Sequence, residues 1–540
     1  MQNYEEFSES QVKILKHFVT NIDSNVFVLR NLPEVIKGAL FSRYSRSSLG
    51  LRSLLLKEFI LNEETAFQAI TGQSGDEIGD QVAAIHKAQN FYDRILDGYG
   101  DDSIGELGGA HLAIENISMI GAKAIEDCRI GGSPLEKSTR YIYFDQKVNG
   151  EFLFYKEPVL MTSAYRDLYL DTCNMLFETY SKLILPMTEL MEEKFPKDDD
   201  TSKVAYGAAL RAKVLDCLRG LLPSSALTNM GVFGNGRFFE GLIKKLNVNN
   251  LVEMQDLGRG AYNELSQLIP SFVRRSDLNH KNQKDFGRFY EAMQEEIRVV
   301  TKQHTEFGGE PRPPGVQLVD SNSEDVKKVA AALLYALSDK KLSELRERCS
   351  TLPDEELARI IDSACNSREN RRHKSPRALE HATFTFEIMS DFGCYRDLHR
   401  HRLLTQERQL LTCNYGYYVP PEIEGTEMES HYKEAMEAAK KAYDTMADEL
   451  PEEAQYVVPM AYNLPWYFNV NLRSLQWLCE LRSSPAGHPN YRYIVQEMAK
   501  LVCKAIPAFE PIFKFVDYEG YEDLGRLGQE IKKVEKLQQS

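Results

Sequence analysis

The chain has 540 residues, of which 43% are hydrophobic, and it carries a formal net charge of −15 at pH 7. Its length allows two to four domains, and its hydrophobic content excludes a globally disordered chain. The acidic balance argues against a protein that works by bulk attraction to nucleic acid or to an anionic membrane, although it is compatible with a local basic pocket.

Three further features indicate the compartment. The first seven residues are polar and acidic and do not resemble a signal peptide. No stretch approaches the roughly 18 apolar residues of a membrane span. The nine cysteines are scattered without a C-x-x-C pair, which favours reduced thiols over a disulfide framework or a zinc site. We therefore expect a soluble cytoplasmic protein without a metal site or a membrane association.

Apolar residues before position 300 recur mainly with helical spacing. The elements that this pattern predicts are helices at 10–25, 51–59 and 75–98, a capped turn at 98–106, a strand at 111–117 and a helix at 118–129. Residues 163–300 are predicted to form mostly long helices, with one break at Leu221-Leu222-Pro223.

A cluster of proline and glycine at Gly308–Gly315 marks the clearest boundary in the chain. Such a cluster is typical of a stiff connector. We assign residues 1–310 to a first domain with an N-terminal extension, 311–315 to the connector and 316–540 to a second domain.

The second domain also mixes helices with a strand. Its predicted elements are a helix at 326–337, a strand at Thr383–Ile388 with a period of two, helices at about 430–448, 470–483 and 491–505, and a charged, frayed helix at 528–540.

The most specific chemical signal is the run Arg400-His401-Arg402, which directly follows His399. Burying so much positive charge without anions would cost several kcal/mol per ion. Because the forked guanidinium group suits phosphate, the run predicts a site for phosphates or a charged cofactor. A solvated basic loop is the alternative.

A short pattern recurs in both halves of the chain. Arg219–Pro223 is matched by Gln455–Pro459, and Asn235-Gly-Arg237 is matched by Asn471-Leu-Arg473 at the same spacing. Together with a similar order of strand and basic helix, this match predicts an internal duplication.

The Arg-His-Arg run resembles part of the signature of the flavin-dependent thymidylate synthases, usually given as R-H-R-x-x-S-x-N-E-x-S-x-R-Y. The resemblance covers most of residues 316–510 and, more weakly, about 39–250. The first half has Cys128-Arg129-Ile130 in place of Arg-His-Arg, but keeps the later part of the signature from Ser133 to Tyr141. The second half has Arg-His-Arg and Thr405, but Thr412-Cys413 replaces Arg-Tyr.

Two later arginines of the family are divided in the same way. The first half keeps Arg219 but has Leu246 at the place of the last family arginine, whereas the second half has Gln455 and keeps Arg482. The resemblance implies a homotetrameric ancestor whose nucleotide pockets combine two neighbouring subunits. A fused pair can then keep one complete composite pocket while the other decays, and the fused chain is expected to form a homodimer that mimics the tetramer.

The resemblance also implies the roles of individual residues. The implied contacts of dUMP are Asp397, Arg400, Glu136, Ser138, Thr139, Arg140, Arg219 and Arg482. The implied contacts of FAD are Arg400, His401, Arg402, Glu136, Asn471, Arg473, Trp477 and Ser103. Arg482 is expected to be catalytic because a guanidinium group beside a carbonyl stabilises developing negative charge. Trp477 stands where the family has Asn, and Asp397 stands where relatives have a Gln that reads the base.

The fold that the resemblance implies is α+β and predominantly helical, with two fused repeats that each combine a small mixed sheet with long helices. The implied function is FAD-dependent conversion of dUMP to dTMP, with methylenetetrahydrofolate as the one-carbon donor and NADPH as the reductant of the flavin. One alternative, motivated by Asp397, is the same flavin scaffold acting on another pyrimidine nucleotide or adding a hydroxymethyl group. The other is a degenerate relative that binds a nucleotide or RNA through residues 400–402, although the net charge makes nucleic acid an unfavoured partner.

Overall fold

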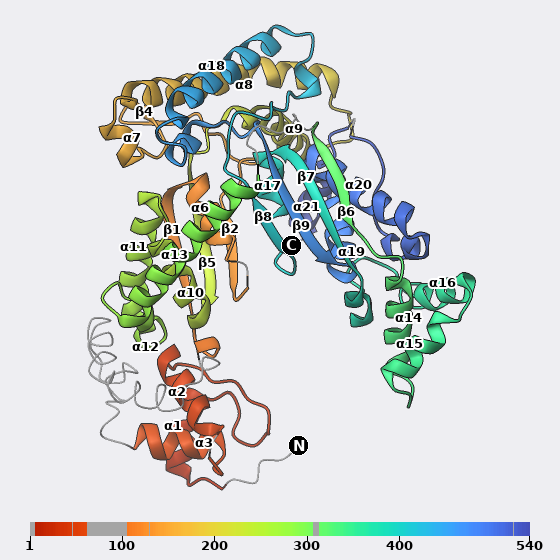
Figure 1. The fold of residues 1–540 in the computed structure, drawn as a ribbon. Coiled ribbons are helices and arrows are strands. Elements are labelled where there is room, and N and C mark those ends of the chain that lie inside the picture. The colour runs from red at the N-terminus through yellow and green to blue at the C-terminus, as the bar shows by residue number, and fades with distance from the viewer. Residues whose placement is uncertain are drawn as a thin grey trace. The chain divides into compact units, whose positions relative to one another are not determined.

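The computed structural model describes residues 6–45, 47–61, 105–128, 130–305, 313–521 and 523–539 (Figure 1). The chain divides into two compact units. Unit 1 consists of Met1–Ile117, Gly121–Glu136 and Thr228–Phe307, and unit 2 consists of Ser118–Ile120, Lys137–Leu227 and Gly308–Ser540. These units are not the same partition as the two halves of the sequence, because residues 137–227 belong to unit 2.

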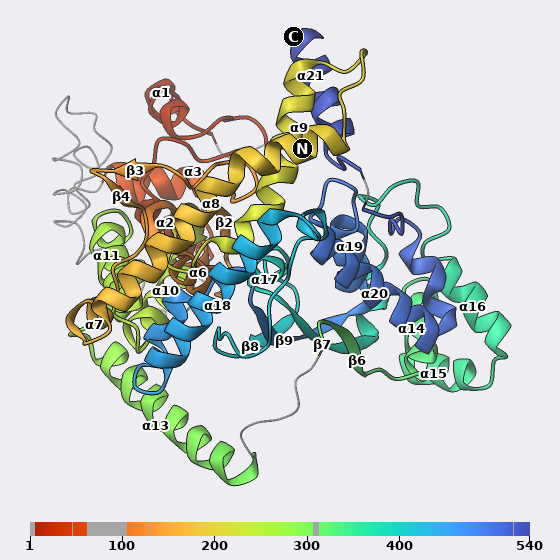
Figure 2. The ribbon, with the colours of Figure 1, turned by 90° about the horizontal axis from the view of Figure 1, so that it is seen from above.

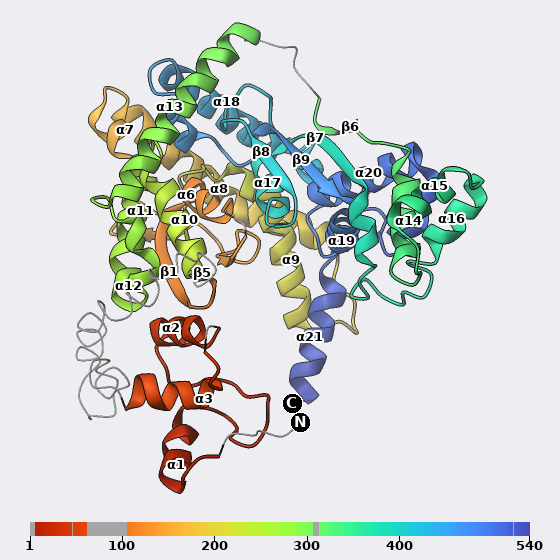
Figure 3. The same cartoon turned by 60° about the horizontal axis from the view of Figure 1, so that its bottom comes forward.

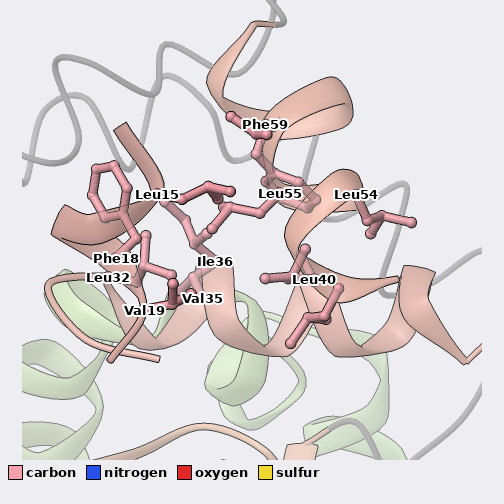
Figure 4. Close-up of a cluster of buried hydrophobic side chains, with 13 residues drawn as sticks. Leu15, Phe18, Val19, Leu32, Val35, Ile36, Leu40, Leu54, Leu55 and Phe59 are labelled. Carbon is pink, nitrogen blue, oxygen red and sulfur yellow. The ribbon is translucent and has the colours of Figure 1, made fainter. Parts of the chain in front are cut away.

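Unit 1 begins with a small helical core (Figure 4). It is built from α1 (Glu9–Phe18), α2 (Glu34–Tyr44), α3 (Leu51–Leu54) and a π-helical turn at Leu55–Ile60. Side chains such as Leu15 and Phe59 interlock in its centre.

Two of the expected helices fall in this region. The helix expected at 51–59 is confirmed, whereas the one expected at 10–25 ends at Phe18. The Asn21 side chain accepts hydrogen bonds from the backbone of Asp23 and Ser24, and this local turn competes with helix continuation. The helix expected at 75–98 and residues 98–104 of the expected turn lie outside the described residues.

A three-stranded sheet lies in unit 1, with the order β1 (Gly109–Ser118), β5 (Leu227–Asn235) and β2 (Gly132–Glu136). The expected strand at 111–117 and the helix after it, α6 (Met119–Glu126), are confirmed. The expectation of mostly long helices in 163–300, with one break at 221–223, did not include the strand β5. This strand alternates buried and exposed side chains, but Gly231 and Gly234 interrupt its apolar pattern in the sequence.

The remaining helices of unit 1 follow β5. They are α10 (Gly236–Asn247), α11 (Val252–Leu268), α12 (Pro270–Val273) and α13 (Lys281–His304). The first two pack against each other, as the green ribbons of Figure 1 show.

Unit 2 contains a four-stranded sheet with the order β6 (Gly315–Asp320), β7 (Thr383–Asp391), β9 (Asn463–Asn471) and β8 (Thr405–Arg408). The expected strand at 383–388 is confirmed, and β9 was not expected. Pro465 explains this omission, because proline is rare in a central strand. Its carbonyl oxygen nevertheless accepts a hydrogen bond from Gln409 N at 3.1 Å.

Helices α17 (Phe392–Leu398), α19 (Leu472–Arg482) and α20 (Pro489–Ala505) contact this sheet. The other helices and the small strands of unit 2 are β3 (Lys147–Val148), β4 (Glu151–Phe152), α7 (Pro158–Thr162), α8 (Arg166–Lys194), α9 (Lys203–Leu218), α14 (Asp325–Tyr335), α15 (Leu342–Ser350), α16 (Asp354–Asp362), α18 (Glu427–Ala447) and α21 (Leu527–Gln539). Helices α8 and α18 lie side by side (Figures 1 and 2), and α9 packs against α21 (Figure 3). The helices expected in the second domain are confirmed within a few residues. None of the helices in the described ranges is both long and apolar enough to cross a bilayer.

The two sheets support the expected duplication. The orders β1-β5-β2 and β7-β9-β8 are equivalent, and both β5 and β9 have nine residues and lead directly into a helix. The registers agree as well, since Ser133 pairs with Phe233 and Thr405 pairs with Asn469. The pairs β2–β5, β6–β7, β7–β9 and β8–β9 are antiparallel, whereas we expected mixed sheets. The α+β class with two repeats is confirmed.

Within unit 2, equivalent segments of the two repeats pair with each other around a local pseudo-two-fold axis. Pro223 and Pro459, which are equivalent by the sequence match, form an antiparallel bridge. Each flanking hydrogen bond has a counterpart with the repeats exchanged: Ser224 N to Val458 O (2.9 Å) with Met460 N to Leu222 O (2.9 Å), and Ser225 N to Tyr456 O (3.1 Å) with Ala461 N to Gly220 O (2.9 Å). Such reciprocal pairing is the geometry of a symmetric dimer interface, which supports a fused pair.

Candidate functional site

The Arg-His-Arg run lies in the turn that follows α17 in unit 2. Asp391 caps this helix by accepting a hydrogen bond from Cys394 N at 2.9 Å, and the helix ends where His401 N donates to Leu398 O. In this turn Arg400 points toward the helix, while Arg402 is exposed. The two arginines therefore have different surroundings.

A cavity of about 430 Å³ lies beside this turn, a size typical of small-molecule sites. Its walls come from three segments of unit 2, namely the loop at 368–375, the turn at 400–404 and helix α19. Seven lining side chains are cationic: Arg368, Arg371, Lys374, Arg400, Arg402, Arg473 and Arg482. Glu480 is the one acidic residue among the lining side chains. A chain with a net charge of −15 thus carries a strongly cationic cavity, which favours an anionic ligand.

Asp397 connects this cavity to the first repeat. Its carboxylate accepts a hydrogen bond from Arg400 Nη2 at 2.6 Å and one from Arg219 Nη1 at 3.1 Å. Burial of Asp397, whose exposed fraction is 8%, opposes its ionisation, but the charges of Arg219 and Arg400 outweigh this effect and hold its pKa well below the ordinary value. Residues of both repeats therefore meet within one chain.

Arg219 also has one atom that suits a ligand. It is 4% exposed, and its Nη2 has no hydrogen-bond partner among the described residues. An unpaired buried donor costs roughly 1–3 kcal/mol. An anionic oxygen placed beside it would remove this cost.

Arg140 is the second residue that the first repeat contributes. It forms a two-pronged ion pair with Asp216, at 2.6 and 2.7 Å, and its Nη1 lies 3.3 Å from the Tyr491 hydroxyl. Burial of Asp216 favours the neutral acid, but the Arg140 guanidinium outweighs this effect and lowers the pKa of Asp216. The Arg482 guanidinium lies 5.8 Å from the centre of the Tyr491 ring, so this tyrosine touches the arginines of both repeats.

The neutral ring of His401 and the cationic guanidinium group of Arg482 are hydrogen-bonded on the cavity wall. Arg482 Nε donates a hydrogen bond to His401 Nε2 at 3.2 Å. Burial and the charges of Arg482 and Arg400 hold the pKa of His401 well below its ordinary value. The ring is therefore neutral at pH 7, and Nε2 is free of a proton and accepts from the guanidinium.

His488 supports the network from the N-terminus of α20. Its Nδ1 accepts a hydrogen bond from Asn490 N at 3.2 Å, and its Nε2 lies 3.3 Å from Asp216 O. The neutral ring with a proton on Nε2 satisfies both contacts. Burial and the charge of Arg219 lower the pKa of His488 to about 3, although Asp216 partly opposes this shift.

The structure places the other expected FAD contacts of the second repeat on or near α19. Trp477 and Arg473 line the cavity. Arg473 donates to Ser375 O at 2.9 Å and to Glu380 at 2.8 Å. Asn471 is not among the lining residues, and its side chain caps α19 by accepting from Ser474 N at 2.9 Å.

The remaining expected residues belong to the first repeat. Ser138 Oγ accepts a hydrogen bond from Arg140 N at 3.2 Å, and Thr139 is buried next to it. Glu136 lies in unit 1, where it accepts from the buried Lys123 at 2.9 Å. Ser103 lies outside the described residues.

Several residues of the site escaped the sequence analysis. Asp216 enters the site through its ion pair with Arg140, 76 positions away, which no local spacing indicates. Arg371 and Lys374 belong to a basic run that is as dense as residues 400–402 and was overlooked. His488 and Tyr491 give no signal in the sequence, because only the fold brings them to Asp216 and Arg140.

The side chains along the cavity suit an elongated anionic cofactor with an aromatic part. The lining residues of α19 run from Arg473 to Arg482, about 15 Å at 1.5 Å per residue. Cationic groups lie at both ends and the indole of Trp477 lies between them, where it can stack on a ring. No cluster of three or more His, Cys, Asp or Glu side chains in the described ranges could hold a metal ion.

Comparison with known families agrees with the motifs. The family described as thymidylate synthase complementing protein matches this chain twice, at residues 61–271 and 317–508. The chain belongs to this family, the flavin-dependent thymidylate synthase family, and contains two copies of its domain in tandem. The resemblance inferred from the residues is thereby confirmed.

Curated relatives share the full tandem length. A UPF0159 protein of Chlamydia pneumoniae is 53% identical over 98% of both chains, and one of Chlamydia muridarum has the same identity and coverage. A UPF0159 protein of Thermoplasma acidophilum is 33% identical and covers 92% of this chain and 98% of its own.

Solved structures with detectable similarity match a shorter part. Crystal structures of a UMP/dUMP methylase from Streptomyces cacaoi, bound with 5-Br UMP and with 5-Br dUMP, are 21% and 22% identical. They cover 37% of this chain and 94% and 95% of their own, with TM-scores of 0.28 and 0.29.

Proposed function

We propose that this protein is an FAD-dependent thymidylate synthase that converts dUMP to dTMP at one composite site, with methylenetetrahydrofolate as the one-carbon donor and NADPH as the reductant. The observation that carries the proposal is the ion network in which Asp397 joins Arg219 of the first repeat to Arg400 of the second, at the edge of a cationic cavity. Membership of the thymidylate synthase complementing protein family supports the reaction class.

The cavity along α19 and the region of the Asp397 network would have different roles. Arg402, Arg473 and Trp477 along the cavity would hold FAD, which supplies the hydride when it is bound. Arg219, with its unsatisfied buried Nη2, and Arg140 would bind the nucleotide near the Asp397 network. This placement puts the pyrimidine ring beside Arg482, where the two regions meet.

Arg482 is the candidate for polarising the pyrimidine. No carboxylate lies within ion-pair distance of it in the described part of the chain, and its neighbour His401 is neutral. Its positive charge is therefore available to a carbonyl oxygen of the ring, where negative charge develops during attack. The enclosed position strengthens this interaction because little water screens it.

The test is the visible absorption spectrum of the purified protein with added FAD, followed by titration with dUMP. We expect flavin bands that dUMP perturbs. We expect Arg482→Ala to keep the flavin bands and lose turnover by a factor of about 100 or more, the cost of removing one oxyanion-stabilising donor. Because Arg482 forms no ion pair with a described carboxylate, this variant should fold normally. Absence of flavin binding by the wild-type protein would refute the proposal.

A second candidate is the same chemistry on another pyrimidine nucleotide. Asp397 replaces the residue that reads the base in relatives, and both of its oxygens are bound by arginines. Base selection then falls to other groups, so competition of UMP and dCMP against dUMP in the flavin titration decides between the candidates. Tighter binding of UMP or dCMP than of dUMP would favour the second candidate.

A further inference from the structure

A second basic segment borders the cavity and has no role in the site described so far. It is the loop between α16 and the 3-10 helix at Arg377–His381, and it contains Arg368, Arg371, Arg372, His373 and Lys374. Arg368, Arg371 and Lys374 line the cavity, while Arg372 is exposed and does not.

Two anchors hold this loop along helix α19. At one end, Arg368 forms a buried two-pronged ion pair with Glu480, at 2.8 and 2.6 Å, and its Nε donates to His373 O at 2.6 Å. At the other end, Ser375 O accepts from Arg473 Nε at 2.9 Å. The loop therefore runs beside α19 from its last turn to its first turn, and Arg371 and Lys374 lie between the anchors.

Some cationic side chains of this wall have an acidic partner, and others have none in the part of the chain that the structure describes. Arg368 is paired with Glu480, Arg400 with Asp397, and Arg473 with Glu380. Arg371 and Lys374 form no hydrogen bond or ion pair with any described residue. Two uncompensated positive charges thus face the cavity from a loop that the structure holds in place.

The first turn of α19 adds to this positive potential. Ser474 lines the cavity one position after Arg473, so the N-terminal end of the helix borders the same space. The helix dipole favours anions, phosphate in particular, at this end, where the N–H groups of Leu472 and Ser474 already donate to Ala382 O and Asn471 Oδ1. A guanidinium fork and an ammonium group complete the surroundings that two phosphates require.

We infer that Arg371 and Lys374 bind the pyrophosphate of a dinucleotide, which the cavity holds with its phosphates toward the first turn of α19 and its redox ring toward Trp477 and Arg482. This inference rests on the proposed function, in which the dinucleotide is FAD. It assigns the phosphate contacts to a loop outside the Arg400–Arg402 run.

The experiment compares three flavins that share one ring system but differ in phosphate content. Dissociation constants of FAD, FMN and riboflavin are measured by flavin fluorescence for the wild type, Arg371→Ala/Lys374→Ala and the control Arg346→Ala/Arg372→Ala. The control removes the same charge from exposed positions of α15 and of the loop that do not line the cavity. Neither Arg371 nor Lys374 is bonded to a described residue, so the variant should fold.

We expect the Arg371→Ala/Lys374→Ala protein to bind FAD at least about tenfold more weakly, the effect of losing one or more charge-assisted hydrogen bonds. Riboflavin affinity should be unchanged and FMN affinity should fall less than that of FAD. The variant should also lose part of the salt dependence of FAD binding, because fewer charges are screened. Equal FAD affinity and salt dependence in the variant and the control would overturn the inference.

The two proposals fail in different ways. If the wild type binds no flavin, the proposed function fails, and titration with inorganic pyrophosphate then decides the inference alone. The loop would be supported as a diphosphate site if the wild type and the control bind pyrophosphate and the Arg371→Ala/Lys374→Ala protein does not. Absence of pyrophosphate binding by the wild type would overturn it.

Discussion

A single buried carboxylate, Asp397, joins residues 178 positions apart in the chain. Its two arginine partners, Arg219 and Arg400, come from different repeats. Removing one partner of a buried ion pair leaves an uncompensated charge, which is the costly case. Asp397 is thus as much a structural link between the repeats as a candidate contact of the nucleotide.

We expect Asp397→Asn to destabilise unit 2 by about 3 kcal/mol, because Arg219 and Arg400 lose the charge that balances them. Both tryptophans of the chain, Trp466 and Trp477, lie in unit 2, so the urea midpoint followed by tryptophan fluorescence reports this unit. Asp444→Asn, in an exposed pair with Lys440 on α18, is the control and should change the midpoint little. Equal midpoints for the two variants would contradict this account.

His488 gives the network a pH dependence of definite sign. Its pKa is about 3 in the folded protein and about 6.5 in the unfolded chain, so between these values the unfolded chain binds more protons. Stability therefore falls as the pH is lowered through this window, with a slope of up to about 1.4 kcal/mol per pH unit. The neutral His401 also makes stability fall as the pH is lowered.

We expect His488→Asn to reduce this loss between pH 7 and pH 5, because asparagine does not titrate and is also a good helix cap. The measurement is the tryptophan-reported urea midpoint of both proteins at each pH. A pH dependence identical to that of the wild type would show that His488 is not the source.

At the scale of elements, helix α19 organises the site. It carries Arg473, Trp477 and Arg482 along one cavity, Glu480 anchors the basic loop to it, and β9 fixes its start. Its counterpart α10 begins in the same way, since Asn235 accepts from Phe238 N as Asn471 does from Ser474 N. The two caps are thus structurally equivalent, and the helix that Asn471 caps, α19, lines the cationic cavity.

This equivalence gives a matched pair of variants. We expect Asn471→Ala and Asn235→Ala each to cost about 1 kcal/mol of stability through the lost cap. Only Asn471→Ala should weaken flavin binding, because only α19 is proposed to border the cofactor. Comparison of flavin dissociation constants checks this, and an equal loss in both variants would argue against α19 as the cofactor helix.

At the scale of the whole molecule, the duplicated chain has specialised its halves. Gln455, which replaces the equivalent of Arg219, binds the backbone of Leu411 and Glu452. Leu246, which replaces the equivalent of Arg482, is buried in its own unit. At these positions the two residues serve packing and backbone hydrogen bonding.

We therefore expect one flavin and one nucleotide per chain. Flavin absorbance per protein absorbance, together with calorimetric titration of dUMP, measures both ratios. Two nucleotides per chain would show that the second set of positions still forms a site.

The sequence reveals more of the chemistry than of the topology. Arg400 and Arg402 could be singled out because a dense run of cationic residues needs a specific surrounding. Arg482 was expected from the family resemblance, and all three arginines line the cavity. Strands β5 and β9 could not be predicted, because glycines and Pro465 obscure their pattern and pairing with neighbouring strands outweighs local preference.

By itself the sequence determined the family, the duplication and the division of the signature between the halves, since these are properties of residue identity and spacing. Only the tertiary structure decided that Arg219 meets Asp397 and that Arg140 meets Tyr491 within one chain, and that residues 368–375 form a wall of the cavity. These contacts join positions that are 98 to 351 residues apart. Their energies depend on burial and on charge balance, which no local pattern encodes.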